Sequence, residues 1–231
     1  MPKKRLEQIQ KELVRGLRVS RRRTREPVIL AMIGITGAGN STVARALAKR
    51  LGWSVIEKNR IRVKLREEGP GFKPATTDQI AYAMLAKVMR ERGNAILDSD
   101  LVERPKRRRL ERFARRFGAR VAYLHLICDS DVMLGRMLRA NYNPKTDIFK
   151  SAAIAVREHS RRYPWHYRWS PGQGGQYIAR RPPGDGYGNS EYDRSGALEE
   201  AASGVSQAPP ANVIGDTCEA ATPRISLCLS Y

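Results

Sequence analysis

Residues 34–42 have the types and spacing of a loop that holds a phosphate group. They read Gly-Ile-Thr-Gly-Ala-Gly-Asn-Ser-Thr, which fits the pattern G-x-x-x-x-G-K-[ST] except that Asn40 stands where the pattern has Lys. The glycines allow a tight turn whose backbone N–H groups point at an anion, and the hydroxyl that follows suits a phosphate-bound Mg²⁺. We therefore expect contacts to a nucleoside triphosphate, ATP or GTP, from Gly34, Thr36, Gly37, Ala38, Gly39, Asn40, Ser41 and Thr42.

A second candidate for chemistry is the acid that ends a short apolar run. Residues 94–98 read Asn-Ala-Ile-Leu-Asp, which predicts a strand with Asp98 at its carboxyl end. In proteins with such a loop, an acid at this position faces the phosphates and can hold Mg²⁺ together with the loop hydroxyl, here that of Ser41. The alternative is a helix-capping or turn acid, and Asp100 is better placed for capping because it lies nearer the following helix.

The elements that would position these residues alternate along the chain. The apolar run 28–33 is bounded by Pro27 and Gly34 and is typical of a strand buried on both faces. Alternating strands and helices predict an α/β fold with a parallel sheet and helices on both faces. Together with the loop at 34–42, this order predicts a three-layer P-loop NTPase fold. The predicted strands are 28–33, 54–57, 94–98 and 120–127; the predicted helices are 4–18, 41–51, 60–67, 77–92, 104–117, 130–140 and 147–162.

This order of motifs resembles the small P-loop kinases. Over about residues 27–163 the chain is most similar to the polynucleotide kinase-like group, with gluconate-kinase-like enzymes as near relatives. The resemblance implies Mg²⁺-dependent transfer of the ATP γ-phosphate to a hydroxyl. It places Asn59 where the family has the Asp that accepts the hydroxyl proton, and Arg62 where an Arg binds substrate phosphate. It also implies a helix that donates Arg136 and Arg139 to the transferring phosphate.

The chain departs from that family at two positions that carry the reaction. Loss of a positioned electrostatic donor such as the loop lysine commonly costs about 10²–10³ in rate, and Asn59 lacks a basic group whose contribution is about 10²–10⁴. We therefore expect impaired transfer, unless Lys58 or Glu57 substitutes, although Lys58 should point the opposite way on an extended segment. Nucleotide binding should suffer less, because backbone N–H groups and the helix dipole do not depend on a lysine.

Charge suggests polyanionic partners. The 231-residue chain has a net charge of +20, concentrated before residue 170. Segment 104–120 is rich in Lys and Arg and is either a solvated helix face or a track for RNA or DNA. This charge favours a polynucleotide 5′-hydroxyl as the acceptor. The second hypothesis is a non-catalytic nucleic-acid-binding protein that retains the kinase fold, and a third is a decayed gene.

Composition divides the chain into three parts. We predict a basic helical arm over 1–26, a kinase-like domain over 27–165 and a flexible Gly/Pro-rich tail over 166–231, with one edge strand near 212–216. The three Cys are widely spaced and suggest neither a disulfide framework nor a zinc site. Because no apolar run approaches 18 residues, we expect no contact with a membrane and a cytoplasmic protein.

Overall fold

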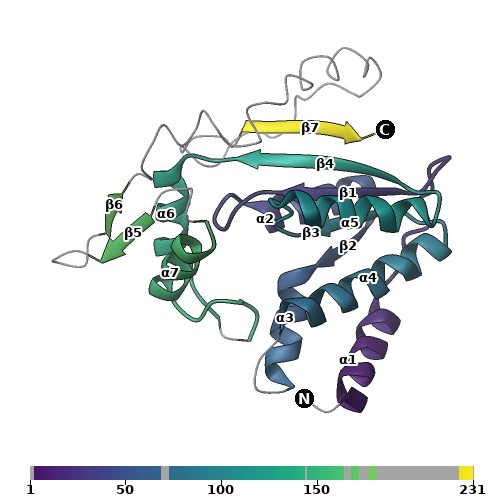
Figure 1. The fold of residues 1–231 in the computed structure, drawn as a ribbon, viewed down its shortest axis with the longest axis horizontal. Helices are drawn as coiled ribbons and strands as arrows, with labels where there is room; N and C mark the ends of the chain where they lie inside the picture. The colour runs from purple at the N-terminus through teal and green to yellow at the C-terminus, as the bar shows by residue number, and fades with distance from the viewer. Residues whose placement is uncertain are drawn as a thin grey trace.

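A five-stranded sheet forms the centre of the computed structural model, which describes residues 3–68, 73–143, 145–163, 168–171, 177–180 and 224–230. The strand order is β2-β3-β1-β4-β7. The first four strands are parallel, and β7 pairs with β4 in the antiparallel sense (Figure 1). The strands are β1 (Val28–Ile33), β2 (Ser54–Glu57), β3 (Ala95–Asp98), β4 (Arg120–Ile127) and β7 (Arg224–Ser230); β5 (Arg168–Pro171) and β6 (Tyr177–Arg180) form a separate pair.

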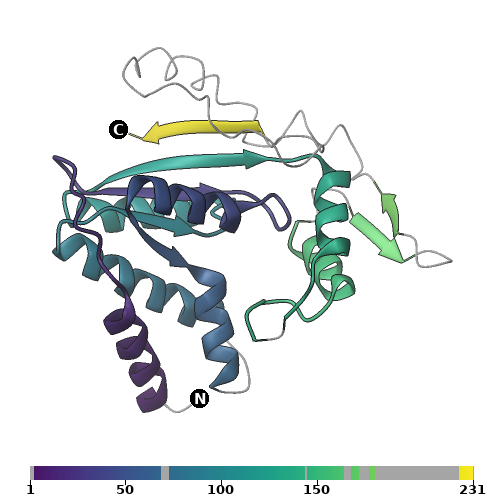
Figure 2. The same cartoon turned by 180° about the vertical axis from the view of Figure 1, so that it is seen from behind.

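Helices cover both faces of this sheet, as predicted. Alternate residues of β1 face opposite ways, so Ile29 packs in the cluster that includes α4 and α5, and Leu30 packs in the cluster that includes α2. Accordingly α2 comes to the front only in the view from behind (Figure 2). The helices are α1 (Lys3–Gly16), α2 (Asn40–Leu51), α3 (Lys58–Glu67), α4 (Pro74–Arg90), α5 (Arg104–Arg115), α6 (Ser130–Arg139) and α7 (Ala152–Arg162).

The predicted α/β architecture is confirmed, with shifts at the element ends. The parallel strands match their predicted ranges to within one residue. The helix α4 starts at Pro74, where a ring without an N–H is tolerated at the first helical position. The helix α7 starts at Ala152 rather than near residue 147, because the Ser151 hydroxyl accepts the N–H of Ile154 as its cap.

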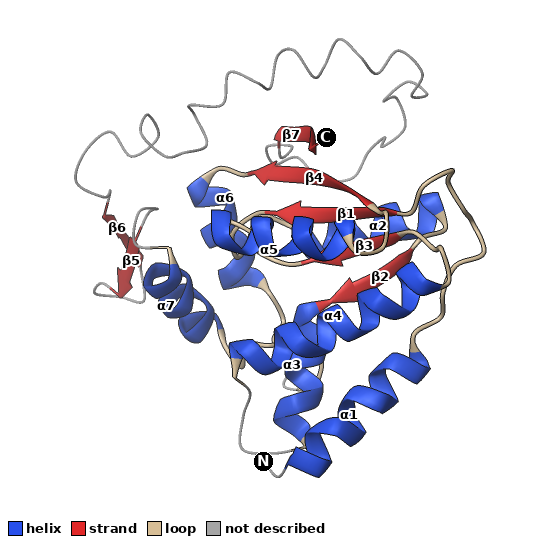
Figure 3. Cartoon of the chain, turned by 45° about the vertical axis from the view of Figure 1, so that its right-hand side comes forward, coloured by secondary structure: helices blue, strands red, loops and turns tan. Residues whose placement is uncertain are grey.

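The amino-terminal helix packs on the domain. Ile9 is fully buried in the cluster that contains α4. Lys87 of α4 donates to the carbonyl oxygens of Val14 and Leu17 at 3.0 and 2.8 Å, which satisfies groups that the end of α1 leaves open. Figure 3 shows α1 lying along α4, on the side of the sheet where β2 is the edge strand.

Three strands, β5, β6 and β7, lie within the predicted tail, and β7 is an edge strand of the main sheet. The edge strand predicted near 212–216 lies outside the described residues. Of the helices that the structure describes, none has the length and apolarity needed to cross a bilayer.

Candidate nucleotide site

The loop between β1 and α2 has the backbone of a phosphate cradle. Gly37 and Gly39 have φ angles of 90° and 103°, a region that L side chains rarely adopt. Gly39 immediately precedes α2 and has no side chain to cap it. The first backbone N–H groups of α2 are therefore available to donate hydrogen bonds to a ligand, and the helix dipole favours an anion there.

Asn40 is held within this loop. Its Nδ2 donates to the carbonyl oxygen of Gly34 at 2.6 Å, and its Oδ1 is buried with no hydrogen-bond partner among the described residues. A Cβ on Gly34 would lie 2.2 Å from that Oδ1, so the fold-back requires glycine at position 34. The Asn40 side chain, which stands where the pattern has lysine, thus donates a hydrogen bond to a backbone carbonyl of its own loop.

Ser41 and Asp98, the two residues expected to hold Mg²⁺, lie side by side. The Ser41 hydroxyl donates to the Asp98 carboxylate at 2.6 Å, because β3 ends directly beside the start of α2. Burial raises the pKa of Asp98, the bond from Ser41 opposes that shift, and Glu57 on the neighbouring strand adds to it.

The donor set fits Mg²⁺ better than a metal that needs several protein ligands. No cluster of three His, Cys, Asp or Glu suited to a metal occurs within the described part of the chain. Mg²⁺ is usually held by one or two protein oxygens, with water and phosphate oxygens completing its shell. Ser41 and Asp98 supply two such oxygens beside the cradle.

A cavity of about 300 Å³ opens in front of the loop. The loop and the end of β3 form one side, and α3, α6 and α7 with the segment before α7 contribute the rest. Among the described lining residues, the carboxylates are Asp98 and Asp100, whereas the cations are Lys58, Arg62, Arg136 and Arg162. This balance suits a polyanionic ligand. The lining residues are Gly34, Ile35, Thr36, Gly37, Gly39, Asn40, Ser41, Thr42, Lys58, Asn59, Arg62, Asp98, Ser99, Asp100, Arg136, Ile148, Phe149, Arg162 and Tyr163.

Asn59 and Arg62 come together on the wall opposite the loop. They sit one turn apart on α3, and Arg62 Nη1 donates to Asn59 Oδ1 at 2.8 Å. Burial and the nearby charge of Arg162 both lower the pKa of Arg62. An amide oxygen that accepts from a cation has no proton-accepting role, so this pair can hold an anionic ligand but lacks a base.

The two arginines of α6 lie in different places. Arg136 lines the cavity and its Nη1 reaches the carbonyl oxygens of Gly37 and Ala38 at 3.4 and 3.3 Å. Arg139 is exposed, is not among the described lining residues, and turns back over Gly135 of its own helix. Ala38 is fully buried behind the loop and also does not line the cavity.

Lys58 and Glu57, the two candidate substitutes for the missing groups, differ in their position relative to the cavity. Lys58 lines the cavity, against the expectation from an extended segment, because it is the first residue of α3. Its Nζ pairs with Asp78 at 2.6 Å. Glu57 is buried between Arg45 and Arg60, at 2.7 and 3.4 Å, and is not among the described lining residues. Lys58 is therefore better placed to substitute for a missing group than Glu57.

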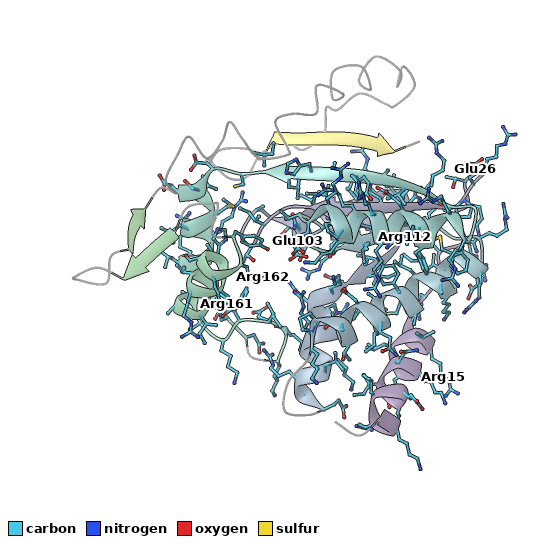
Figure 4. The ribbon with its side chains drawn as sticks, viewed as in Figure 1. Arg15, Glu26, Glu103, Arg112, Arg161 and Arg162 are labelled. Atoms are coloured by element: carbon cyan, nitrogen blue, oxygen red, sulfur yellow. The ribbon has the colours of Figure 1, made fainter. Side chains whose placement is uncertain are left out.

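Sequence reasoning missed the part of the wall that comes from α7. Arg162 pairs with Asp100 (Figure 4 shows Arg162 on the side of α7 that faces the sheet). Burial works against the ionisation of Asp100, yet Arg162 and other cations hold its pKa below the ordinary value. Asp100 is not the cap of α5, which begins after Glu103.

A buried histidine holds α7 against the loop. His159 Nδ1 lies 3.1 Å from the Thr36 carbonyl oxygen, and its ring packs edge-on against Tyr163 at 5.1 Å between centroids. Tyr163 belongs to an aromatic and basic cluster in the sequence that could have pointed to this wall; residues 164–167 of that cluster lie outside the described residues.

Comparison with known proteins places residues 29–161 in a family of which the model is described as an AAA domain. This range agrees with the predicted P-loop resemblance over 27–163. No curated protein matches the chain. The solved structures that it is similar to include a candidate kinase from Chloroflexus aurantiacus J-10-fl, with 17% identity over 59% of this chain and 80% of that chain and a TM-score of 0.47.

Two further structures show similar levels of likeness. One is the Pnkp1/Rnl/Hen1 complex, with 19% identity over 56% of this chain and 45% of that chain and a TM-score of 0.40. The match therefore spans less than half of that protein. The other is a gluconokinase from Sinorhizobium meliloti 1021, with 20% identity over 61% of this chain and 75% of that chain and a TM-score of 0.37.

Proposed function

The chain belongs to the AAA domain family, and from that premise we propose that it binds ATP or GTP with Mg²⁺ in the cavity beside Gly34–Thr42. The observation that carries the proposal is the cradle itself: two glycines with positive φ lead into an uncapped helix, beside an Asp98–Ser41 pair. Backbone N–H groups at such a helix start bind phosphate without any side chain.

Each part of the cavity has a role in that binding. The loop N–H groups hold the phosphates, and Arg62, Arg136 and Arg162 add positive charge around them. Ser41 and Asp98 would hold Mg²⁺, which neutralises charge on the phosphate oxygens. Arg136 already reaches two loop carbonyls, so it is positioned at the loop before a ligand arrives.

We further propose that phosphate transfer to a hydroxyl is impaired in this chain. The Asn40 amide is neutral and therefore does not supply the charge that a loop lysine would bring. Its Nδ2 donates to the Gly34 carbonyl oxygen. Asn59 accepts from Arg62 and cannot take a proton. Both groups act in the same transition state, where stabilising charge and accepting a proton are needed together. A polynucleotide 5′-hydroxyl is the acceptor that the positive cavity favours.

The decisive experiment is calorimetric titration of the full chain with ATP, ADP and adenosine, each with and without Mg²⁺. We expect ATP to bind more tightly than ADP, adenosine not to bind measurably, and Mg²⁺ to strengthen ATP binding. If adenosine binds as tightly as ATP, the loop is not a phosphate cradle and the proposal is wrong.

Nucleic-acid binding without catalysis is a second candidate, supported by the outer face of α5. Arg108, Arg112 and Arg115 are exposed on this helix, Arg116 is exposed directly after it, and Figure 4 labels Arg112 on it. By contrast, Arg107 is tied to the carbonyl oxygens of Leu101 and Val102. A row of exposed guanidinium groups is suited to a phosphate backbone, which it would bind without regard to sequence.

The salt dependence of binding to single-stranded RNA and DNA tests this second candidate. Replacing Arg108 and Arg112 by Gln should reduce the slope of log affinity against log salt by about 1.4, since each lost phosphate contact on a single strand contributes about 0.7. The matched control replaces Lys49 and Arg50, which are exposed on α2. Equal losses in both variants would assign the effect to net charge alone.

A further inference from the structure

A second cavity lies behind the wall of the first. It has a volume of about 290 Å³ and is bounded by α4, the end of β3 and the start of α5. The two cavities share Lys58 and Ser99 among their lining residues. The second cavity is therefore adjacent to the nucleotide site, but it contains none of the loop residues that would hold phosphate.

The wall of this cavity is mainly apolar, with cations at its rim. Its apolar lining consists of Ala81, Tyr82, Leu85, Leu97, Leu101 and Pro105. Lys106 and Arg109 are respectively 34% and 56% exposed in their side chains, which places them toward solvent. Burial raises the pKa of Tyr82 to about 12, so this ring is neutral at physiological pH.

A buried hydroxyl at the inner end has no partner. Ser99 is 6% exposed, lines both cavities, and its Oγ makes no hydrogen bond within the described residues. A buried hydroxyl left without a partner costs about 1–3 kcal/mol, and native structures rarely retain one without a reason. A ligand group that bonds Ser99 would remove that penalty.

The charged side chains of the cavity are largely paired, which leaves Arg109 as the cation that is held least closely. Lys106 Nζ pairs with Glu103 at 2.6 Å. Asp78 is the carboxylate that lines it, and Lys58 Nζ holds that carboxylate at 2.6 Å. Arg109 stands farther off, with Nη1 at 3.9 Å from Asp78 and its guanidinium 4.9 Å from the centre of the Tyr82 ring. Arg109 can therefore turn to an anion at the mouth while the Lys58–Asp78 pair stays intact.

From these features we propose that the second cavity is a binding site for a small organic anion with an apolar body. The anionic group, a carboxylate or a phosphate, meets Arg109 at the mouth. The apolar body lies against Tyr82, Leu85 and Leu101, and a hydroxyl or carbonyl at the far end bonds Ser99 Oγ. Pockets that combine apolar walls with a few placed polar groups are the usual form of a small-molecule site.

Three probes that differ in one group each separate the parts of this proposal. They are 4-hydroxybenzoate, benzoate, which lacks the hydroxyl, and 4-hydroxybenzyl alcohol, which lacks the anion. Binding to the full chain is measured by calorimetry without nucleotide, so the outcome does not depend on the nucleotide proposal. We expect 4-hydroxybenzoate to bind about fivefold more tightly than benzoate and at least tenfold more tightly than the alcohol.

Matched variants locate the contacts. Arg109→Gln should weaken 4-hydroxybenzoate about tenfold, whereas Arg108→Gln, an equal charge change at an exposed neighbour on α5, should leave its affinity unchanged. Ser99→Ala should remove the difference between 4-hydroxybenzoate and benzoate and leave benzoate binding as it was. Circular dichroism spectra and melting temperatures of the variants confirm that each is folded.

Three results would overturn the proposal. One is that no probe binds at millimolar concentration. The second is that Arg108→Gln and Arg109→Gln weaken binding equally, which would indicate attraction to net charge. The third is that a folded Ala81→Leu variant, which adds three carbon atoms at a residue that lines the cavity, binds 4-hydroxybenzoate as well as the parent.

Discussion

The two walls of the nucleotide cavity are built in different ways. The loop wall consists largely of backbone, with Gly37 and Gly39 in conformations that aim N–H groups at a ligand. The opposite wall is made of paired side chains: Arg62 pairs with Asn59 on α3, and Arg162 of α7 pairs with Asp100, which follows β3. We expect the loop wall to tolerate Asn40, because its main donors are backbone N–H groups and not side chains.

The difference separates binding from chemistry. A backbone cradle keeps its shape when one side chain changes, provided the glycines remain. In a wall of side chains a single substitution removes a functional group, and an amide such as that of Asn59 cannot accept a proton. We therefore expect the protein to retain nucleotide affinity more than transfer activity, and the following predictions test that contrast.

The largest effect is expected from repairing both walls together. The double variant Asn40→Lys, Asn59→Asp should raise phosphate transfer by about 10³-fold or more, beyond the product of the single gains, because both groups serve one transition state. The measurement is transfer of radiolabelled phosphate from ATP to oligonucleotide 5′-hydroxyls and to gluconate. If the double variant stays as inactive as the parent on both acceptors, only the fold is shared with kinases.

Two arginines of α6 provide the matched control for that experiment. In the double variant, Arg136→Ala should abolish the regained transfer, since Arg136 lines the cavity, and Arg139→Ala should leave it intact, since Arg139 is exposed outside it. The sequence alone expected both to act. A parent chain that turns over at about 1 s⁻¹ or faster would contradict the separation and point to Lys58.

Repair of the loop wall alone should improve binding. Asn40→Lys should tighten ATP binding by about 1.5–3 kcal/mol, the size of a hydrogen bond to a charged group. Because the variant also gives up the Asn40–Gly34 bond, its melting temperature without ATP should fall slightly. Calorimetric titration with ATP measures the affinity, and an affinity equal to that of the parent would show that the loop does not hold phosphate.

Breaking one pair in the side-chain wall should reduce stability. Arg162→Gln should lower the free energy of unfolding by about 1–3 kcal/mol, between the values for exposed and buried pairs, because Asp100 then keeps its burial without its partner. Arg161→Gln, at an exposed neighbour on α7, is the control. Urea titrations of the two variants make the comparison.

The pH dependence of that loss has a defined sign. The pKa of Asp100 is lower in the folded protein than its ordinary value, so the ionised carboxylate stabilises the fold above pH 3.8 and that contribution is lost as the pH falls through the folded pKa. The difference between parent and Arg162→Gln should therefore shrink on acidification. A difference that stays constant down to pH 3 would show that packing, not charge, causes the loss.

The smallest effect is expected from a single methyl group on the backbone wall. Gly37→Ala places a Cβ 3.2 Å from the Cβ and the carbonyl oxygen of Met133, at a φ of 90°, and should cost about 1–2 kcal/mol of stability. ATP affinity should fall with it, whereas Gly118→Ala, also at positive φ but in open space, should lose stability without losing affinity. Thermal melts and ATP titrations distinguish the two.

The fold could be predicted from the sequence because its signals are local. A buried apolar run, a glycine loop and a helical stripe follow directly from residues 28–51, and the same alternation repeats up to β4. The strand β7 was missed although Ile225, Leu227 and Leu229 alternate with other residues. Such a short pattern far from the other strands does not indicate its partner, because pairing with β4 is a long-range contact.

The sequence could predict only those site residues that lie at the carboxyl edge of the parallel strands, in or directly after a strand–helix connection. Ser41 lies at the start of the helix that follows β1, and Asp98 is the last residue of β3, so the parallel sheet brings them to one edge. Arg162 and Tyr163 come from the far end of α7, and no spacing rule places a helix end opposite a loop more than a hundred residues earlier. Their position depends on packing, including the contact of His159 with Thr36.

The edge strand β7 has a consequence for how the chain folds. Its seven residues pair with β4 across about a hundred intervening positions, so the sheet edge closes only after a long loop has been brought together. Until then the outer side of β4 carries unpaired backbone groups that another chain can join. Newly made protein therefore passes through a stage in which self-association competes with completion of the sheet, and a chain truncated before residue 224 stays at that stage.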